Sequence, residues 1–304
     1  MNPPARLPLS ARDSIEIREL TLVFRPARSE DKPRVLGFTA RTWDDGDYIV
    51  DVFDAWLADA TGRFTAIELD GQVVAIGKLT DLGDGELWLE GLRVDPAHRQ
   101  KGVGEALHNY HVDLAQRIGG RVLRYATGED NVVSRMFGER TNFQHISSYR
   151  WSVADASTDF RPPERLTLND LPMLRPCLDS PLMRSAHGLY QEAWKWRALS
   201  EARLKAHLEA GQVLGLRFES GLRAWSICSI EAGSEALPLH HLDGIDRSAL
   251  VAMAQAMRRT AADASRKTIE TFALEPSPLI GALGEAGYRV EDFTMIIFEL
   301  QLKP

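Results

Sequence analysis

The sequence predicts two domains of the α/β class, each built on a mixed sheet. Three observations support this prediction. The chain has 304 residues, which is more than one hydrophobic core usually serves. Strand and helix patterns alternate in its first half, and a similar order returns after a break near residue 160. Hydrophobic residues make up 44% and charged residues 26% of the chain, as in ordinary globular proteins.

The first half is predicted to fold in the order β-α-α-β-β-β-α-β-α-β. Residues 20–26 have the β-branched and aromatic content of a strand, and Ser29-Glu30-Asp31 caps a following helix. Asp70-Gly71 joins two strand-like runs as a tight hairpin. The other predicted elements are a helix at 48–60, strands at 63–69, 72–80 and 86–94, a helix at 100–118, a strand at 122–126, a helix at 131–139 and a strand at 144–153.

The second half reads as a weak repeat of the first. Polar residues and Pro162-Pro163 interrupt the pattern at 154–164, so we expect one domain at 1–155 and a second at 160–304. The predicted elements are a helical region at 194–210, strands at 213–218, 222–230 and 236–242, a helix at 249–264, and strands at 269–273 and 293–300. His240, His241 and Asp243 do not suggest a metal, because adjacent strand residues face opposite ways. We expect no metal site.

Charge and cysteine content exclude several function classes. The net charge of −7 argues against a nucleic-acid binder, which needs a basic footprint. Cys177 and Cys228 lie far apart and in no metal-ligand spacing, which fits buried thiols in a reducing compartment. No stretch approaches the roughly 20 apolar residues that span a bilayer, and no leader pattern opens the chain. We therefore expect a cytoplasmic protein that binds neither membrane nor nucleic acid.

The most informative segment leads from the strand at 86–94 into the helix after residue 100. Backbone amides in the first turn of a helix lack internal partners, and the helix dipole adds positive charge, so this junction is a ready anion site. Gly102 and Gly104 let a phosphate approach the backbone closely, and Arg99 and Lys101 add charge at the rim. The segment predicts a pyrophosphate site.

Two other phosphate loops do not fit this segment. A Walker loop needs Gly-Lys-Ser/Thr, but here Lys101 precedes the glycine and no hydroxyl follows. A dinucleotide fingerprint needs a third glycine, and Leu107 stands at that position.

Arg99, Gly102 and Gly104 match the signature Arg/Gln-x-x-Gly-x-Gly/Ala, and over about 20–153 the chain resembles the GNAT superfamily of acyl-CoA-dependent N-acyltransferases. The predicted element order agrees with that family's mixed, splayed sheet, and the second half resembles a degenerate copy. The resemblance implies acetyl-CoA, or another acyl-CoA, as co-substrate. It also implies that the strand before the loop pairs with the pantetheine arm. The implied cofactor-binding residues are Leu92, Arg93, Val94, Arg99, Gln100, Lys101, Gly102, Val103, Gly104, Glu105 and Asn131.

The resemblance also implies catalytic groups. Glu90 lies on the strand where the family often places the general base, although a solvated or ion-paired carboxylate is the simpler alternative. Many members carry a tyrosine that protonates the departing thiolate, and the nearest residue here is Phe137, which cannot. The thiolate of a thiol with a pKa of about 8.5 is a tolerable leaving group even without a general acid.

The acceptor site is expected around residues 43–56. Acidic and aromatic residues alternate there and would favour an ammonium group, with Trp43, Asp47 and Tyr48 as the best candidates. For Asp51 and Asp54 a solvated helix face is the better interpretation. The pattern also resembles acetyltransferases that act on free amino acids such as histidine.

The sequence thus leads to an N-acetyltransferase that modifies the primary amine of a small molecule. A non-catalytic acyl-CoA-binding or scaffold protein is the alternative from another class, suggested by Phe137 and the silent second half. Acetylation of protein lysines or N-termini is a third interpretation. The sequence leaves the oligomeric state open, a homodimer included.

Overall fold

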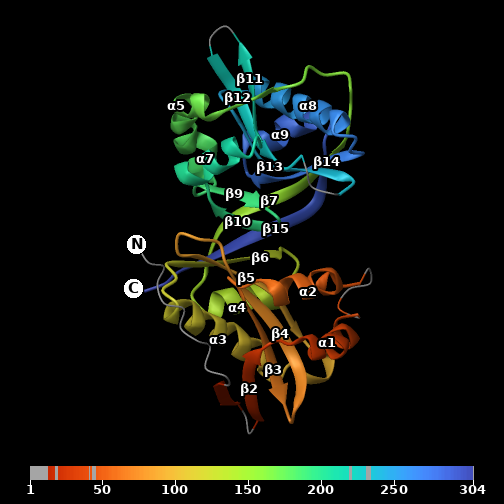
Figure 1. The fold of residues 1–304 in the computed structure, drawn as a ribbon, viewed down its shortest axis with the longest axis vertical. Coiled ribbons are helices and arrows are strands. Elements are labelled where there is room, and N and C mark those ends of the chain that lie inside the picture. The colour runs from red at the N-terminus through yellow and green to blue at the C-terminus, as the bar shows by residue number, and fades with distance from the viewer. Residues whose placement is uncertain are drawn as a thin grey trace. The chain divides into compact units, whose positions relative to one another are not determined.

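A computed structural model describes residues 13–17, 20–40, 42, 46–218, 221–230 and 234–303. Contacts between Cα atoms divide the chain into two compact units (Figure 1). Unit 1 comprises residues 1–125, 133–144 and 299–304, and unit 2 comprises residues 126–132 and 145–298. Each unit is described by itself below.

Unit 1 contains an antiparallel meander that ends in a parallel pair. Its strand order is β1-β2-β3-β4-β5-β6, and each pair from β1 to β5 is antiparallel. The strands are β1 (Asp13–Ile17), β2 (Leu20–Pro26), β3 (Arg63–Leu69), β4 (Gln72–Asp81), β5 (Glu86–Val94) and β6 (Val122–Gly128). The parallel register of β5 and β6 covers only three residue pairs, from Glu86 with Val122 to Trp88 with Arg124. Beyond that ladder β5 remains paired with β4 up to Val94 and then leads into the loop of interest.

The helices of unit 1 carry apolar stripes that cover this sheet. They are α1 (Lys32–Thr39), α2 (Ile49–Ala58), α3 (Val103–Arg117) and most of α4 (Val132–Arg140). An aromatic cluster of Phe38, Phe53, Trp56 and Phe64 joins α1 and α2 to the sheet. Helix α3 lies closely on β4, since a Cβ at Gly77 would meet Leu107 and His111 at 3.1 Å.

Unit 2 repeats much of this order. Its sheet contains β7 (Gln144–Asp155), β8 (Glu164–Arg165), β11 (Val213–Phe218), β12 (Gly221–Cys228), β13 (Ala236–Gly244), β14 (Thr268–Glu275) and most of β15 (Arg289–Gln301). As in unit 1, an antiparallel meander, β11-β12-β13, ends in a parallel pair, β13 with β14. The helices are α5 (Leu171–Leu174), α6 (Pro181–Ser185), α7 (Glu201–Glu209), α8 (Arg247–Asp263) and α9 (Pro278–Glu285). A separate hairpin consists of β9 (Leu189–Glu192) and β10 (Lys195–Ala198).

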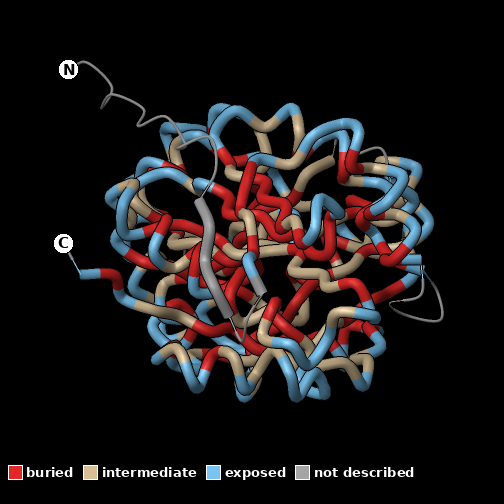
Figure 2. The backbone as a smooth tube through the Cα atoms, turned by 90° about the horizontal axis from the view of Figure 1, so that it is seen from below, coloured by how far each residue is buried: buried red, intermediate tan, exposed pale blue. Residues whose placement is uncertain are grey.

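Two apolar clusters form the core of unit 2. One packs α8 and α9 against the sheet, with Met253, Met257 and Leu283 fully buried. The other lies around α5, α7 and β11 and includes Leu174 and Leu204. Figure 2 shows the buried positions in the interior and the exposed ones along the outer turns.

The two units do not coincide with the two halves of the sequence. Strand β7, which ends the first half of the sequence, pairs antiparallel with β14 from Ser148 with Glu275 to Asp155 with Thr268. The final residues of β15 instead group with unit 1, where the Leu302 amide donates to the Arg121 carbonyl at 2.9 Å. The two units therefore differ from the predicted domains at 1–155 and 160–304. The predicted domain boundaries remain a prediction about the repeat in the sequence.

Most predicted elements are present, and the mixed sheets are confirmed. The hairpin at Asp70-Gly71 is confirmed, with φ angles of 51° and 77°. The prediction of helix at 194–210 is wrong in its first part, because residues 195–198 are strand β10 and helix begins only at Glu201. Strands β1 and β9 and helix α9 were not predicted from the sequence.

Candidate functional site

The junction between β5 and α3 has the geometry of an anion site. Asp95 ends β5 and accepts from the Ala97 amide at 3.0 Å, which starts a short 3-10 turn. The chain then passes through Gln100 at φ 61° and Gly102 at φ 85°, both in the left-handed region. Gly102 is the N-cap of α3 and offers no side chain to the first amides, whereas its carbonyl accepts from Ala106 at 2.9 Å. The first-turn amides of α3 are therefore not capped by a side chain.

The cationic side chains predicted at the rim are exposed there. Arg99 and Lys101 are both exposed, and Arg99 Nε donates to the Val94 carbonyl at 3.3 Å. This bond holds one guanidinium beside the end of β5. The N-terminal end of the α3 dipole and these two side chains are all positive, so the junction favours a polyanion.

The second glycine of the loop has a packing role. A Cβ at Gly104 would lie 3.4 Å from both Val94 Cγ2 and Phe137 Cζ, which is close to ordinary van der Waals contact. The helix start therefore sits tightly between β5 and α4. Phe137 stands beside this loop and also faces His108, with ring centroids 6.1 Å apart.

Strand β5 contains a bulge just before the loop. Ile76 pairs with Arg93 and Lys78 with Glu90, so one residue of β4 opposes both Gly91 and Leu92. Gly91 adopts φ 67°, and a Cβ there would come within 2.5 Å of Trp56 Cζ3. The bulge lets α2 press its tryptophan onto the main chain of β5, and it re-aims the residues on either side.

Glu90 lies at the edge of this bulge in a polar network. Its Oε1 accepts a hydrogen bond from Thr80 Oγ1 and lies 3.7 Å from Lys78 Nζ. The side chain is 13% exposed. The carboxylate is thus mostly enclosed and held on one side by β4.

The predicted acceptor residues have different surroundings. Asp47 is buried and accepts from Arg93 Nε at 2.6 Å and from the Ile49 amide at 3.1 Å, so it pairs with Arg93 and also binds the first residue of α2. Tyr48 is 44% exposed, with the Arg93 guanidinium 5.1 Å from its ring centroid. Trp43 lies outside the described residues. Asp54 forms an exposed ion pair with Lys32, as a solvated helix residue does.

Asn131 immediately precedes α4 and is exposed; its amide donates to the Gly128 carbonyl at 3.0 Å. By contacts it belongs to unit 2, while the glycine loop belongs to unit 1. Its predicted role toward the coenzyme therefore stays a prediction.

Sequence reasoning missed Lys78, Thr80 and Asp59, which surround Glu90. Strand β4 is buried at every position between its two end residues, Lys78 included. A lysine inside such an apolar run must be paired, and that signal could have led to the network.

The corresponding junction of unit 2 is closed to an anion. Asp246 is the N-cap of α8, and its carboxylate accepts from the Ala249 amide at 2.8 Å. A Cβ at Gly244 would lie 3.2 Å from the Leu250 nitrogen, so the backbone is already crowded. A negative side chain occupies the place where unit 1 has an uncapped helix start.

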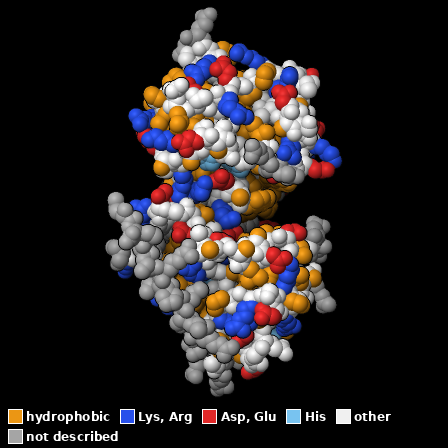
Figure 3. Space-filling view, in the orientation of Figure 1, with side chains coloured by type: hydrophobic (Ala, Val, Ile, Leu, Met, Phe, Trp, Pro, Cys, Tyr) orange, Lys and Arg blue, Asp and Glu red, His pale blue; other side chains and the backbone are white. Residues whose placement is uncertain are grey.

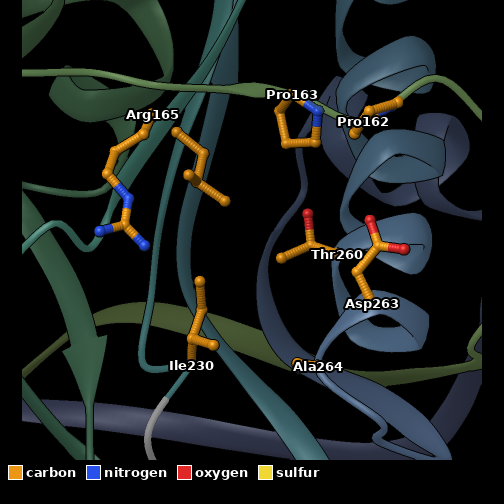
Figure 4. A pocket seen from close by; sticks show the side chains of 8 residues that line it. Pro162, Pro163, Arg165, Ile230, Thr260, Asp263 and Ala264 are labelled. Atoms are coloured by element: carbon orange, nitrogen blue, oxygen red, sulfur yellow. The ribbon is translucent and has the colours of Figure 1, made fainter.

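A cavity of about 290 Å³ lies elsewhere in unit 2. Its walls come from the linker, β8, β11 and α8, with Arg165 on one side and Asp263 on the other (Figure 4). None of the predicted site residues lines it. In Figure 3 the basic and acidic side chains are interspersed within each unit rather than gathered into a basic patch.

The described residues contain neither a metal-binding cluster nor a helix that could cross a membrane. Three or more His, Cys, Asp or Glu side chains nowhere come together as a metal-binding group. Cys228 is buried and Cys177 partly buried, and both are free thiols. None of the helices is long and apolar enough to cross a bilayer.

Known proteins resemble this chain in both sequence and fold. Residues 25–143 match the model of the acetyltransferase (GNAT) family. Histidine N-acetyltransferases from Oreochromis niloticus and Scomber australasicus are 30% and 28% identical over 96 residues, or 31% of this chain. The match spans only 28% of the length of each relative.

Solved structures match nearly the whole chain. A tandem GNAT protein from the clavulanic acid biosynthesis pathway has a TM-score of 0.58 at 15% identity, covering 93% of this chain and 99% of that one. A GCN5-related N-acetyltransferase from Sphaerobacter thermophilus has a TM-score of 0.64 at 13% identity, covering 93% and 96%. The chain thus has the tandem GNAT fold, and its residues 25–143 match the model of the acetyltransferase (GNAT) family.

Proposed function

We propose that this protein transfers an acetyl group from acetyl-CoA to the primary amine of a small molecule. The observation that carries the proposal is the uncapped start of α3, bearing the glycine signature and following the strand that holds Glu90. Acetyl-CoA is the acyl donor of this family, and the matched segment includes every residue of the loop. The activity of the whole chain is part of the proposal.

In this proposal the main chain does most of the binding. Amides from Gln100 to Glu105 hold the pyrophosphate, and Arg99 and Lys101 supply charge at its rim. Main-chain groups of Leu92 and Val94 pair with the pantetheine arm as a strand would. Arg93 contributes through its backbone, because its guanidinium is engaged with Asp47. The short β5-β6 ladder supports this assignment, since β5 extends beyond it.

Glu90 is the proposed general base. It takes a proton from the ammonium or attacking amine, directly or through water, and the amine nitrogen then bonds to the acetyl carbonyl carbon. Main-chain amides of β5 near the bulge stabilise the resulting oxyanion. Collapse of the tetrahedral intermediate breaks the carbon–sulfur bond and releases CoA thiolate, which Phe137 cannot protonate and which takes its proton from water.

An amino acid is the proposed class of acceptor. The histidine N-acetyltransferases that match part of this chain support it, as do the aromatic side chains of Tyr48 and Trp56 beside Glu90. Asp47 acts indirectly in this proposal: because it is paired with Arg93, it orients the start of α2 and not the ammonium group. Trp43 keeps its proposed role in the acceptor wall.

The test combines binding and turnover. Calorimetric titration with acetyl-CoA should show binding, and a panel of amino acids and other amines should give amine-dependent release of free CoA thiol. Replacing Glu90 with Gln should leave acetyl-CoA affinity intact and lower turnover about 10²-fold to 10⁴-fold at neutral pH. Absence of acetyl-CoA binding would overturn the proposal.

Two other outcomes separate the alternatives. Tight binding with no release for any amine would favour the non-catalytic acyl-CoA-binding protein suggested by Phe137. Acetylation of peptides but not of free amino acids, measured by mass spectrometry, would favour the protein acetyltransferase.

A further inference from the structure

We infer that Lys78, Thr80 and Asp59 form a hydrogen-bonded relay that positions Glu90. These three are positioning residues that act through Glu90. The inference rests on the proposed function, in which Glu90 is the base.

Lys78 is the centre of the relay. Its side chain is only 3% exposed, yet its Nζ donates to Asp59 Oδ2 at 2.6 Å and to Thr80 Oγ1 at 2.7 Å. The same nitrogen lies 5.6 Å from the ring centroid of Trp56. A buried ammonium group is retained only where it is paired, and these contacts supply the partners that Lys78 needs.

Thr80 gives the relay its direction. A hydroxyl group carries one proton, and the Thr80 oxygen already accepts from Lys78. Its own proton is therefore directed to Glu90 Oε1, to which it donates. Because Lys78 and Glu90 face each other across β4 and β5, the strand register fixes the geometry of the whole chain. One oxygen of the proposed base is thereby held in place.

Asp59 anchors the relay to the acceptor helix. It follows α2, and its Oδ1 accepts from the Thr61 amide at 2.9 Å and the Gly62 amide at 3.1 Å. Burial alone would raise the pKa of Asp59, but hydrogen bonds from Lys78 and Thr61 more than offset this and hold it well below its usual value. Asp59 therefore stays charged wherever the enzyme works. It ties the end of α2, which carries Trp56, to the carboxylate of Glu90.

The first experiment measures kcat and KM for the best amine with wild type, Lys78→Met and Lys78→Arg. Loss of the donor that holds Thr80 should lower kcat at least tenfold in Lys78→Met, with an unchanged KM for acetyl-CoA. Lys78→Arg, which keeps a charged donor, should retain more of the activity. An unchanged kcat in Lys78→Met would overturn the role of Lys78 in the relay.

The second experiment tests the hydroxyl. Thr80→Val should lower kcat at least tenfold with an unchanged KM for acetyl-CoA, while Thr80→Ser should retain most of the activity. Equal losses of kcat in Thr80→Val and Thr80→Ser would show that Thr80 acts only through packing, and would overturn the relay.

A third measurement separates failure of this inference from failure of the proposed function. Crystal structures of wild type and Thr80→Val need no turnover. The Glu90 carboxylate should keep one position in wild type and lose it in Thr80→Val. If wild type acetylates no amine but Glu90 loses its position in the variant, the network exists and the proposed function is wrong. If turnover occurs and Glu90 keeps its position in the variant, the relay is wrong.

Discussion

Gly91 lies where β5 bends around the side chain of Trp56, and this contact allows a sharp test. Gly91→Ala should destabilise the protein by about 3 kcal/mol or more, because a positive φ costs an alanine about 1–2 kcal/mol and the crowding beside Trp56 adds to it. Acetyl-CoA affinity should fall with it, since the bulge leads into the loop. Chemical unfolding and calorimetry measure both.

Gly71→Ala is the matched control for Gly91→Ala. Gly71 has a similar φ of 77°, but a Cβ there would meet no atom within 4 Å. It should therefore show only the backbone cost, about 1–2 kcal/mol. Adding Trp56→Phe, which removes the crowding ring, should partly rescue Gly91→Ala. Equal costs at Gly71 and Gly91 would mean that Trp56 does not press on the strand.

Buried histidines should make stability fall in mild acid. Burial lowers the pKa of His111 to about 3 and that of His108 to about 4, from 6.5. The unfolded chain binds these protons first, so the stabilisation is complete above pH 6.5 and is lost as the pH falls toward the folded values. Each should contribute a loss of about 1.4 kcal/mol between pH 7.5 and 5.5.

Urea unfolding at the two pH values measures this effect. His111→Gln should reduce the difference between them by about 1.4 kcal/mol, whatever it does to absolute stability. His187→Asn, at an exposed position, should keep the wild-type difference. A wild-type difference in His111→Gln would show that this imidazole is not buried uncharged.

At the residue scale, the sequence located backbone features better than side-chain partners. The positive φ of Gly102 was predictable because it depends on local conformation. The partners of Asp47 and Glu90 were not, because Arg93 and Lys78 lie on other strands or far along the chain. An acidic segment predicted an ammonium site, whereas the buried carboxylate of Asp47 already has its cation.

At the element scale, the start of α3 predicts a contrast between its two glycines. Gly102→Ala places a side chain at φ 85° and should lower acetyl-CoA affinity at least tenfold by distorting the loop. Gly104→Ala meets its neighbours at 3.4 Å and should change affinity by no more than about threefold, given a small shift of Phe137. Calorimetric titration of both variants measures the two affinities for acetyl-CoA. A larger loss in Gly104→Ala than in Gly102→Ala would mean that the loop does not hold the pyrophosphate.

The β9-β10 hairpin shows where pattern reading at this scale failed. Ala193 and Trp194 form its turn with φ angles of 49° and 63°, a conformation usually given to Asn-Gly or Gly-Gly. Without those residues no turn was visible, and Trp194, Trp196 and Leu199 were consistent with helix. The strands at Asp70-Gly71 carried the usual turn residues and were predicted correctly.

At the scale of the whole molecule, residues 299–304 at the C-terminus belong to unit 1. Glu299 accepts from Arg124 Nε at 2.6 Å, and Leu302 is buried beside Gly120. Deleting residues 299–304 should remove about 3 kcal/mol and lower the melting temperature by roughly 5–10 °C. Deleting only Lys303 and Pro304 should have little effect. Equal melting temperatures for the two deletions would contradict this placement.

The placement of β7 in unit 2 and of the C-terminal residues in unit 1 could not be predicted from the sequence. Periodicity located β7 at the end of the first half and β15 at the end of the second, but it says nothing about which sheet each strand enters. A division at residue 155 follows from the linker composition alone. The pairing of β7 with β14 depends on contacts between residues more than 100 positions apart.

The two helix starts predict one acyl-CoA per chain. In unit 1 Gly102 leaves the amides of α3 uncapped, whereas in unit 2 the Asp246 carboxylate caps α8 and would repel a phosphate. Calorimetric titration of the full chain should therefore give a stoichiometry of one. A Gly102→Val chain should bind none, while Asp246→Asn, which keeps a capping side chain without its charge, should still bind one. Two sites in wild type, or binding that survives Gly102→Val, would show that unit 2 also holds coenzyme.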